Sequence, residues 1–262
     1  MIALFPSRTV AIELFGFAVH WYGLLYLVGF LLGYLLLPRL QRYRGLALSN
    51  EDWAEVLSFA VIGVIVGGRL GYVLLYDPMQ YLTHPLEIFA VWKGGMASHG
   101  GFVGVFLALL YVTRKRRIPL LPLIDVVVVP VALGLALGRV GNFINQELYG
   151  SVTALPWGIS IPNVEGIRHP TQIYAMIKDL LIAGVCSAHL RSPHSTVGRT
   201  AALFGGLYAV LRFLIEFLRV PSHAPFVLGA LTITRGQAYT IPLFLIAIGL
   251  WIWAGRRMSN EK

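Results

Sequence analysis

Seven stretches of this sequence are apolar, and each is about as long as a helix that crosses a membrane. A spanning helix needs roughly 20 predominantly apolar residues. The stretches, some interrupted by a glycine or a polar residue, cover approximately residues 18–37, 54–76, 94–113, 119–138, 170–190, 200–218 and 237–255. Of the 262 residues, 57% are hydrophobic and only 13% are charged, whereas about 25% are charged in a typical soluble domain. The sequence therefore predicts an all-α integral membrane protein with seven transmembrane helices, which forms a single polytopic membrane domain over residues 1–262.

The cysteine content and the net charge exclude several classes of function. One cysteine, Cys186, allows neither an internal disulfide framework nor a cysteine-ligated metal cluster. The formal net charge is +9, but the basic residues lie in short loops between apolar stretches, so we expect contact with anionic lipid headgroups and no nucleic-acid binding. We also expect no cleavable signal peptide, because residues 1–18 lack a basic segment followed by a small-residue cleavage site.

Lysine and arginine are divided unequally between the two sides of such a helix bundle. Twelve of them fall in the loops after the first, third and fifth stretches and in the C-terminal tail, and six fall on the opposite side. Because positively charged loops are retained in the cytoplasm, the N-terminus is predicted to lie outside and the C-terminus in the cytoplasm. The short excursion of residues 151–169 then forms a small head on the outer face.

The most specific polar motif follows the fourth apolar stretch. Residues 138–150 read Gly-Arg-Val-Gly-Asn-Phe-Ile-Asn-Gln-Glu-Leu-Tyr-Gly. This run holds one cation, two amides and one carboxylate, which are Arg139, Asn142, Asn145 and Glu147. Such groups at the end of a membrane span are costly unless they have a function. We expect the glycines at 138, 141 and 150 to let the backbone turn tightly and approach a ligand.

Two histidine- and tyrosine-containing segments each allow two interpretations. Tyr22, in Val19–Gly23, either belongs to an interfacial aromatic belt or directs its hydroxyl into a polar cavity. His99 lies among four glycines in Gly94–Gly101 and is either a hydrogen-bonded core residue or an accessible imidazole in space made for a ligand. An imidazole titrates near neutral pH and can therefore accept a proton from a reacting group.

The sixth stretch places four polar side chains on one helical face, because their spacing is four, four and three residues. They are Tyr208, Arg212, Glu216 and Arg219. Arg212 and Glu216 can form a purely structural pair, with Arg219 extending toward the membrane surface. However, an arginine this deep in a span faces the bundle interior by default and marks a functional site. Arg69, in the second stretch, is either a structural cation or a headgroup contact, and Asp125 is expected to be a buried partner for a cation.

These segments together resemble the bacterial phosphatidylglycerol–prolipoprotein diacylglyceryl transferases. The 138–150 run contains every fixed position of that family's Gly-Arg-x-Gly-Asn-x-x-Asn-x-Glu-x-x-Gly signature. His-Trp-Tyr-Gly at 20–23, His-Gly-Gly at 99–101 and Gly-x-Tyr-x-x-x-Arg-x-x-x-Glu at 206–216 also match in the same order, and weaker matches cover 67–72 and 169–174. Two departures are Ala175, where the family commonly has glutamate, and the shorter 151–169 excursion.

The resemblance implies a multi-pass enzyme of the bacterial cytoplasmic (inner) membrane with its active site toward the periplasm. It implies transfer of the diacylglyceryl group of phosphatidylglycerol to the thiol of the lipobox cysteine of a prolipoprotein signal peptide, the first step of lipoprotein maturation. The products are a thioether and glycerol 1-phosphate. Neither a cofactor nor a metal is implied.

The resemblance also implies roles for particular residues. The candidate catalytic residues are His99 as the base, Arg139 and Arg212 as the cations that stabilise phosphate charge, and Tyr22. The candidate phosphatidylglycerol-binding residues are Arg139, Asn142, Asn145, Glu147, Gly150, Tyr208, Glu216, Arg69 and Arg219. Within this set, Glu147 and Glu216 are expected to orient the arginines.

Two other classes of function are compatible with buried charge in a membrane protein. A transporter or channel marks its path in the same way, although the polar residues here gather toward the outer half and no inverted repeat is visible. A lipid-binding membrane scaffold is the third class. Lipidation of a peptide in vitro distinguishes the enzyme from both.

Overall fold

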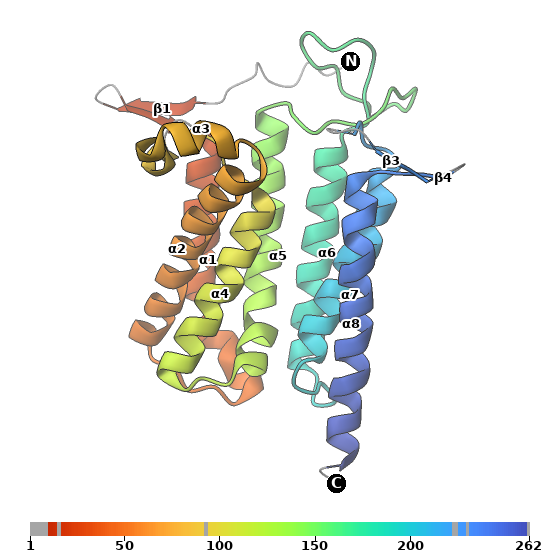
Figure 1. Ribbon diagram of the computed structural model, residues 1–262. Helices are drawn as coiled ribbons and strands as arrows, with labels where there is room; N and C mark the ends of the chain where they lie inside the picture. The colour runs from red at the N-terminus through yellow and green to blue at the C-terminus, as the bar shows by residue number, and fades with distance from the viewer. Residues whose placement is uncertain (1–9, 15–16, 92–93, 222–224, 229–230, 261–262) are drawn as a thin grey trace. The chain divides into compact units, whose positions relative to one another are not determined.

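A computed structural model describes residues 10–14, 17–91, 94–221, 225–228 and 231–260, with the backbone alone at a few of these positions, among them Ser98 and His99. The described chain is mainly helical (Figure 1), which confirms the predicted class. The elements are β1 (Val10–Leu14), β2 (Phe17–His20), α1 (Trp21–Leu40), η1 (Gln41–Arg44), α2 (Asn50–Leu75), α3 (Pro78–Thr83), η2 (Pro85–Phe89), α4 (Ser98–Arg116), α5 (Leu120–Ile144), α6 (Thr171–Arg191), α7 (Arg199–Glu216), β3 (Phe226–Leu228), β4 (Leu231–Ile233) and α8 (Arg235–Asn260).

Five helical segments among the described residues are long and apolar enough to cross a membrane. They are Trp21–Arg44, Asn50–Leu75, Leu120–Ile144, Thr171–Arg191 and Arg235–Arg256. Helices α4 and α7 also fall on predicted stretches, but α4 begins with Ser-His-Gly-Gly and ends in basic residues, and α7 carries two arginines and a glutamate. The chain is therefore a multi-pass membrane protein by the composition of its helices.

The two short hairpins, β1–β2 and β3–β4, are antiparallel pairs that the sequence analysis did not anticipate. Residues 18–20 were expected to open the first helix. They belong instead to β2, whose backbone is paired with β1, and α1 begins at Trp21.

The described chain divides into two compact units, one made of residues 1–36 and 124–262 and the other of residues 37–123. In the second unit, α2 and α4 pack through facing glycines. A Cβ atom at Gly67 would lie 2.3 Å from the carbonyl oxygen of Gly100, and one at Gly104 would lie 2.1 Å from that of Gly63. Small residues of this kind let membrane helices approach closely. Gly100, which we expected to leave space for a ligand, is thus occupied by helix packing.

The first unit contains α6, α7 and α8 and most of α1 and α5. Asp125, fully buried in α5, accepts hydrogen bonds at both carboxylate oxygens from backbone N–H groups, those of Gly198 (2.7 Å) and Ala201 (2.8 Å). The carboxylate therefore caps the N-terminus of α7, where backbone N–H groups lack intrahelical partners and the helix dipole favours an anion.

At the other end of this unit, three chain segments are joined by backbone hydrogen bonds. The N–H of Gly150, after α5, donates to the carbonyl of His169, before α6, at 2.9 Å. The N–H of Ser151 donates to the carbonyl of Leu218, after α7, at 2.9 Å. These bonds bring together the C-terminal ends of α5 and α7 and the N-terminal end of α6, and with them the polar residues discussed next.

Candidate active site

Tyr22, Asn142 and Glu147 form one hydrogen-bonded group, although Tyr22 is more than 100 residues away from the other two. The hydroxyl of Tyr22, in the first turn of α1, donates to Oε1 of Glu147. Nδ2 of Asn142, at the end of α5, donates to the same Oε1 (2.8 Å) and to the Tyr22 hydroxyl oxygen. The tyrosine ring lies against Gly141, where a Cβ atom would be 3.1 Å from Cε1. Tyr22 therefore acts within the polar cluster, and Gly141 provides the space for its ring.

The turn that carries Glu147 is made by non-glycine residues in a left-handed conformation. Gln146 and Leu148 both have φ of 57°. We expected Gly138, Gly141 and Gly150 to make this turn, but none of the three has a positive φ angle. Gly138 and Gly141 lie inside α5 instead. Residues in such sparsely populated conformations need support from their surroundings and cluster at functional sites.

The support for this turn comes from the start of α6. Oγ1 of Thr171 donates to the carbonyl of Leu148 (2.8 Å), and Nε2 of Gln172 donates to the carbonyl of Glu147 (2.7 Å). Both α6 side chains are buried. They belong to the 169–174 segment that the sequence marked only weakly, and they hold the backbone that positions the carboxylate.

Arg139 is hydrogen-bonded to one side chain and attracted to the carboxylate of another. Its Nη1 donates to Oδ1 of Asn142 at 3.1 Å, and its Nε lies 3.8 Å from Oδ2 of Asp179 on α6. Asp179 is also bonded to the ammonium of Lys178. Lys178 and Asp179 are not among the predicted site residues, although two charges in an apolar stretch are a signal of function in a membrane protein.

On α7, Arg212 and Glu216 are directly paired, as their spacing predicts, and Arg219 lies 3.9 Å from the same carboxylate oxygen. The carboxylate of Glu216 lies against Gly236 at the start of α8, where a Cβ atom would be 2.6 Å from it. Glu216 therefore pairs directly with Arg212 and attracts Arg219, and the absence of a side chain at 236 leaves space for its carboxylate.

Three arginines line one pocket in this unit. The pocket is bordered by Arg139, Asn142, Leu148, Thr171, Gln172, Ala175, Arg212, Ile215 and Arg219. Guanidinium groups bind phosphate and carboxylate with paired hydrogen bonds. Oε1 of Gln172, which lines the pocket, is buried without a hydrogen-bond partner among the described residues and can accept a hydrogen bond from a hydroxyl group. The pocket has the charge and the donors to bind an anionic headgroup.

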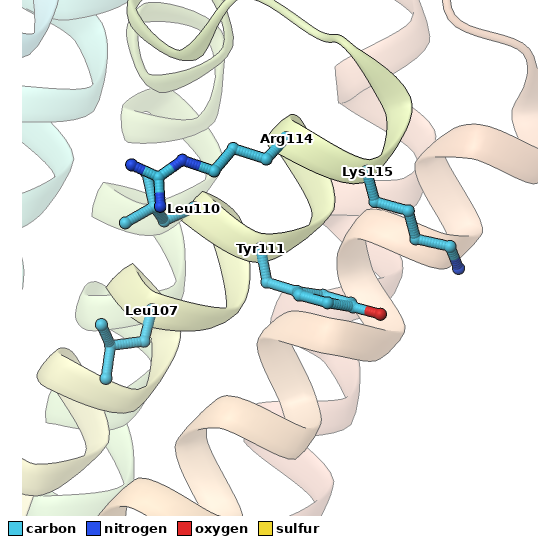
Figure 2. Close-up of a pocket in the computed structure, with 5 residues that line it drawn as sticks. All are labelled: Leu107, Leu110, Tyr111, Arg114 and Lys115. Atoms are coloured by element: carbon cyan, nitrogen blue, oxygen red, sulfur yellow. The ribbon is translucent and has the colours of Figure 1, made fainter.

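A second, larger groove lies on α4, and Figure 2 shows the side chains that line it. Its lining residues are Leu107, Leu110, Tyr111, Arg114 and Lys115. Lys115 is already bonded to Glu55 at 2.8 Å, and Arg114 is the one arginine of the groove, whereas the smaller pocket is lined by three. The arginine-lined pocket is therefore the candidate active site.

The remaining predicted site residues have more varied surroundings. Tyr208 stacks on Phe204, and its ring centroid lies 4.0 Å from Nζ of Lys178. Gly150 has no room for a Cβ atom, which would lie 2.6 Å from the carbonyl oxygen of Leu218, so its small size is explained by packing. The side chain of His99 lies outside the described part of the structure.

Arg69 is buried in the other unit and is held by backbone. Its guanidinium donates to the carbonyls of Glu87 (2.5 Å), Ile88 (2.9 Å), Gly94 (2.6 Å) and Gly95 (3.1 Å). It also lies over the ring of Tyr81, 5.1 Å from the centroid. Arg69 was expected to be either a structural cation or a contact for a lipid headgroup. These backbone contacts are those of a structural cation.

Comparison with known proteins gives the same family over nearly the whole chain. Residues 9–253 match the family model described as prolipoprotein diacylglyceryl transferase. The chain belongs to the prolipoprotein diacylglyceryl transferase family. It is 44% identical to a phosphatidylglycerol–prolipoprotein diacylglyceryl transferase of Geobacter sulfurreducens over 91% of this chain and 92% of that protein. Enzymes of the same name from Polaromonas naphthalenivorans and Bordetella avium are 42% and 39% identical over 96% of this chain and, respectively, 97% and 96% of their own lengths.

In the part of the chain that the structure describes, no three His, Cys, Asp or Glu side chains gather in a way that could hold a metal ion. The cations that face the pocket are side chains of the protein itself.

Proposed function

We propose that this chain transfers the diacylglyceryl group of phosphatidylglycerol to the thiol of the lipobox cysteine of a prolipoprotein. The observation that supports this most directly is the pocket lined by Arg139, Arg212 and Arg219. The named activity of the relatives supplies the reaction.

The reaction explains why the pocket needs cations. In this proposal His99 takes the proton of the cysteine thiol, the sulfur attacks the terminal glycerol carbon of the diacylglyceryl group, and a carbon–sulfur bond forms. The bond between that carbon and the phosphate oxygen breaks, and its electron pair stays on the oxygen as glycerol 1-phosphate leaves. Negative charge therefore grows on the phosphate, and preorganised guanidinium groups in a water-poor site stabilise it. The nucleophile belongs to the substrate, so the enzyme needs no cysteine in the site.

The residues divide into those that bind the phosphate and those that orient the binders. Arg139 and Arg212 carry the phosphate charge, and Arg219 adds a third cation at the same pocket. Asn142 and Glu216 hold the first two arginines in place. Tyr22 and Glu147 fix Asn142. In this proposal Asn145, whose Oδ1 can accept a hydrogen bond, and Tyr208 contact the hydroxyl groups of the headgroup.

The same proposal includes the membrane arrangement. All seven long helices cross the bacterial cytoplasmic membrane as one domain, with the N-terminus and the 151–169 excursion in the periplasm and the C-terminus in the cytoplasm. The twelve basic residues of the cytoplasmic segments support this orientation. It puts the arginine pocket at the periplasmic end, where a lipobox cysteine arrives.

The direct test is incubation of the purified protein with labelled phosphatidylglycerol and a lipobox peptide. We expect a peptide that carries the labelled diacylglyceryl group through a thioether, and no product with a cysteine-to-serine peptide. A protein that binds the lipid but never modifies the peptide is a transporter or a lipid-binding scaffold.

The orientation makes a prediction of its own. A reporter of cytoplasmic location fused after Lys262 is expected to be active, and one inserted near Glu165 is expected to be inactive, because these positions lie on opposite sides of the membrane. A periplasmic reporter at the same two sites serves as the control and must give the reverse pattern. If both positions report the same side, at least one of the seven spans does not cross.

The proposed base makes a second prediction. His99→Gln is expected to slow transfer by about 10²–10⁴-fold at saturating lipid, the usual contribution of a general base. Binding of phosphatidylglycerol should change little, because glutamine is polar and of similar reach. Transfer rate should be measured against pH for both proteins.

The alternative is a thiol that is already ionised when it arrives. In that case the deficit of His99→Gln shrinks as the pH approaches the thiol pKa of about 8.5. Two results together would exclude His99 as the base. One is a wild-type transfer rate that shows no titration near the pKa of a histidine, and the other is a transfer rate of His99→Gln that is reduced by less than about tenfold.

A further inference from the structure

Two adjacent charged residues of α6, Lys178 and Asp179, are buried beside the arginine pocket. Their side chains are only 3% and 1% exposed. Removing two charges from water is expensive, and such a pair adds little to stability compared with apolar residues of the same size. A buried pair within a membrane helix is therefore a candidate for a role in the site.

The carboxylate of Asp179 is shared unequally between two cations. Its Oδ1 accepts a hydrogen bond from Nζ of Lys178. Its Oδ2 lies 3.8 Å from Nε of Arg139, which is too far for a hydrogen bond, and both of these atoms are buried without one. Lys178 is held from the other side by the ring of Tyr208, whose centroid is 4.0 Å from Nζ.

This sharing controls how Arg139 presents its charge. A carboxylate with both oxygens free forms a forked, two-bond pair with a guanidinium, and that pair uses two of the guanidinium's N–H groups. Because Lys178 occupies one oxygen of Asp179, Arg139 remains attracted to the carboxylate without being bonded to it. Nη2 of Arg139 makes no hydrogen bond to the described residues, so it remains available to the pocket.

The charge balance of the site agrees with this arrangement. The site contains four cations and three carboxylates. The cations are Arg139, Lys178, Arg212 and Arg219, and the carboxylates are those of Glu147, Asp179 and Glu216. The formal surplus of one positive charge matches a phosphodiester, which carries one negative charge. Without Lys178 the surplus disappears.

We infer that Lys178 and Asp179 are a positioning pair that keeps Arg139 oriented without a hydrogen bond to the Asp179 carboxylate, and that Lys178 thereby sets the affinity of the pocket for the phosphate of the lipid. This inference rests on the proposed function. Neither residue touches the substrate in this arrangement, since both act through Arg139.

The test measures KM and kcat separately for phosphatidylglycerol and for a lipobox peptide. Lys178→Met frees Asp179 to close on Arg139, so the KM for phosphatidylglycerol is expected to rise about tenfold or more and kcat to fall less than that. Loss of binding that is common to substrate and transition state appears in KM rather than in kcat. The KM for the peptide should not change. Lys178→Gln, which keeps a hydrogen bond to Asp179 without the charge, is expected to raise the lipid KM by a smaller factor.

The double variant Lys178→Met/Asp179→Asn keeps the test informative if the single variant does not fold, because it leaves no unpaired buried charge. It restores the charge balance and is expected to bring the lipid KM back to within about threefold of wild type. Lys115→Met is the matched control, because it also breaks a lysine–carboxylate pair, but an exposed one with Glu55, and it should leave both KM values unchanged.

Two results overturn the inference. One is a folded Lys178→Met or Lys178→Gln protein with an unchanged lipid KM, which makes the pair structural. The other is a double variant whose lipid KM rises as far as, or further than, that of the single variants. A wild-type protein that does not modify the peptide refutes the proposed function instead, so the two failures are distinguishable.

Discussion

Replacement of Arg139 by alanine is expected to lower the rate of diacylglyceryl transfer by at least about 100-fold, the usual effect of removing one preorganised donor from a site that stabilises developing charge. Arg139 lines the pocket, bonds to Asn142 and is attracted to Asp179. Its loss removes a cation from the pocket and leaves a buried carboxylate with one partner fewer. The measurement is the initial rate of peptide lipidation by purified variants of equal folded amount.

Arg139→Lys separates charge from geometry. Lysine restores the charge but lacks the planar fork that bonds to Asn142 and to a phosphate together, so we expect poor rescue. Arg42→Ala is the matched control, because Arg42 is a basic residue of η1 whose hydrogen bond to Tyr43 is exposed, and it should behave as wild type. Near-normal transfer by Arg139→Ala contradicts the assignment of the pocket.

The sequence was sufficient for the part of the site that is continuous in the chain. Arg139, Asn142 and Glu147 lie within nine residues, and helix geometry puts Arg139 and Asn142 on neighbouring turns, where they are bonded. Arg212 and Glu216 are four apart and are likewise paired. Local spacing predicts such contacts because an α-helix repeats every 3.6 residues.

Contacts between distant segments could not be derived in this way. Tyr22 reaches Glu147 across 125 residues, and only the family resemblance suggested that it belongs to the site. The 169–174 segment was marked only as a weak match, and its spacing did not show that Thr171 and Gln172 support the 146–148 turn, because non-glycine residues adopt the left-handed conformation there only under tertiary constraint.

The interpretation of glycine was the weakest part of the prediction. Glycines near polar residues were expected to leave space for a ligand. Gly100 instead lets α2 and α4 pack closely, and Gly150 lets the chain after α5 lie against His169 and Leu218. Both uses need the absence of a side chain, and a sequence does not distinguish them. The buried Lys178 and Asp179 were visible in the sequence, and the cost of burying charge was the signal that should have brought them into the site.

On α7, Arg212→Gln is expected to lose at least about 100-fold in transfer rate, and Glu216→Gln about tenfold. Arg212 lines the pocket and faces the phosphate in our proposal, whereas Glu216 only orients it and Arg219. Glutamine at 216 keeps the shape of the side chain against Gly236 and removes the charge. Rates should be compared at saturating phosphatidylglycerol, with folded protein quantified by size-exclusion chromatography.

A third variant distinguishes orientation from charge. Gly236→Ala keeps every charge but places a methyl group 2.6 Å from the present position of the Glu216 carboxylate, which must then move and take its two arginines with it. If Glu216 acts by orienting, Gly236→Ala should resemble Glu216→Gln in rate and leave the pH dependence unchanged. The opposite result is an active Arg212→Gln protein together with a loss of folded protein in Glu216→Gln and Gly236→Ala. In that case the Arg212–Glu216 pair stabilises the contact between α7 and α8, and Arg139 stabilises the phosphate without Arg212.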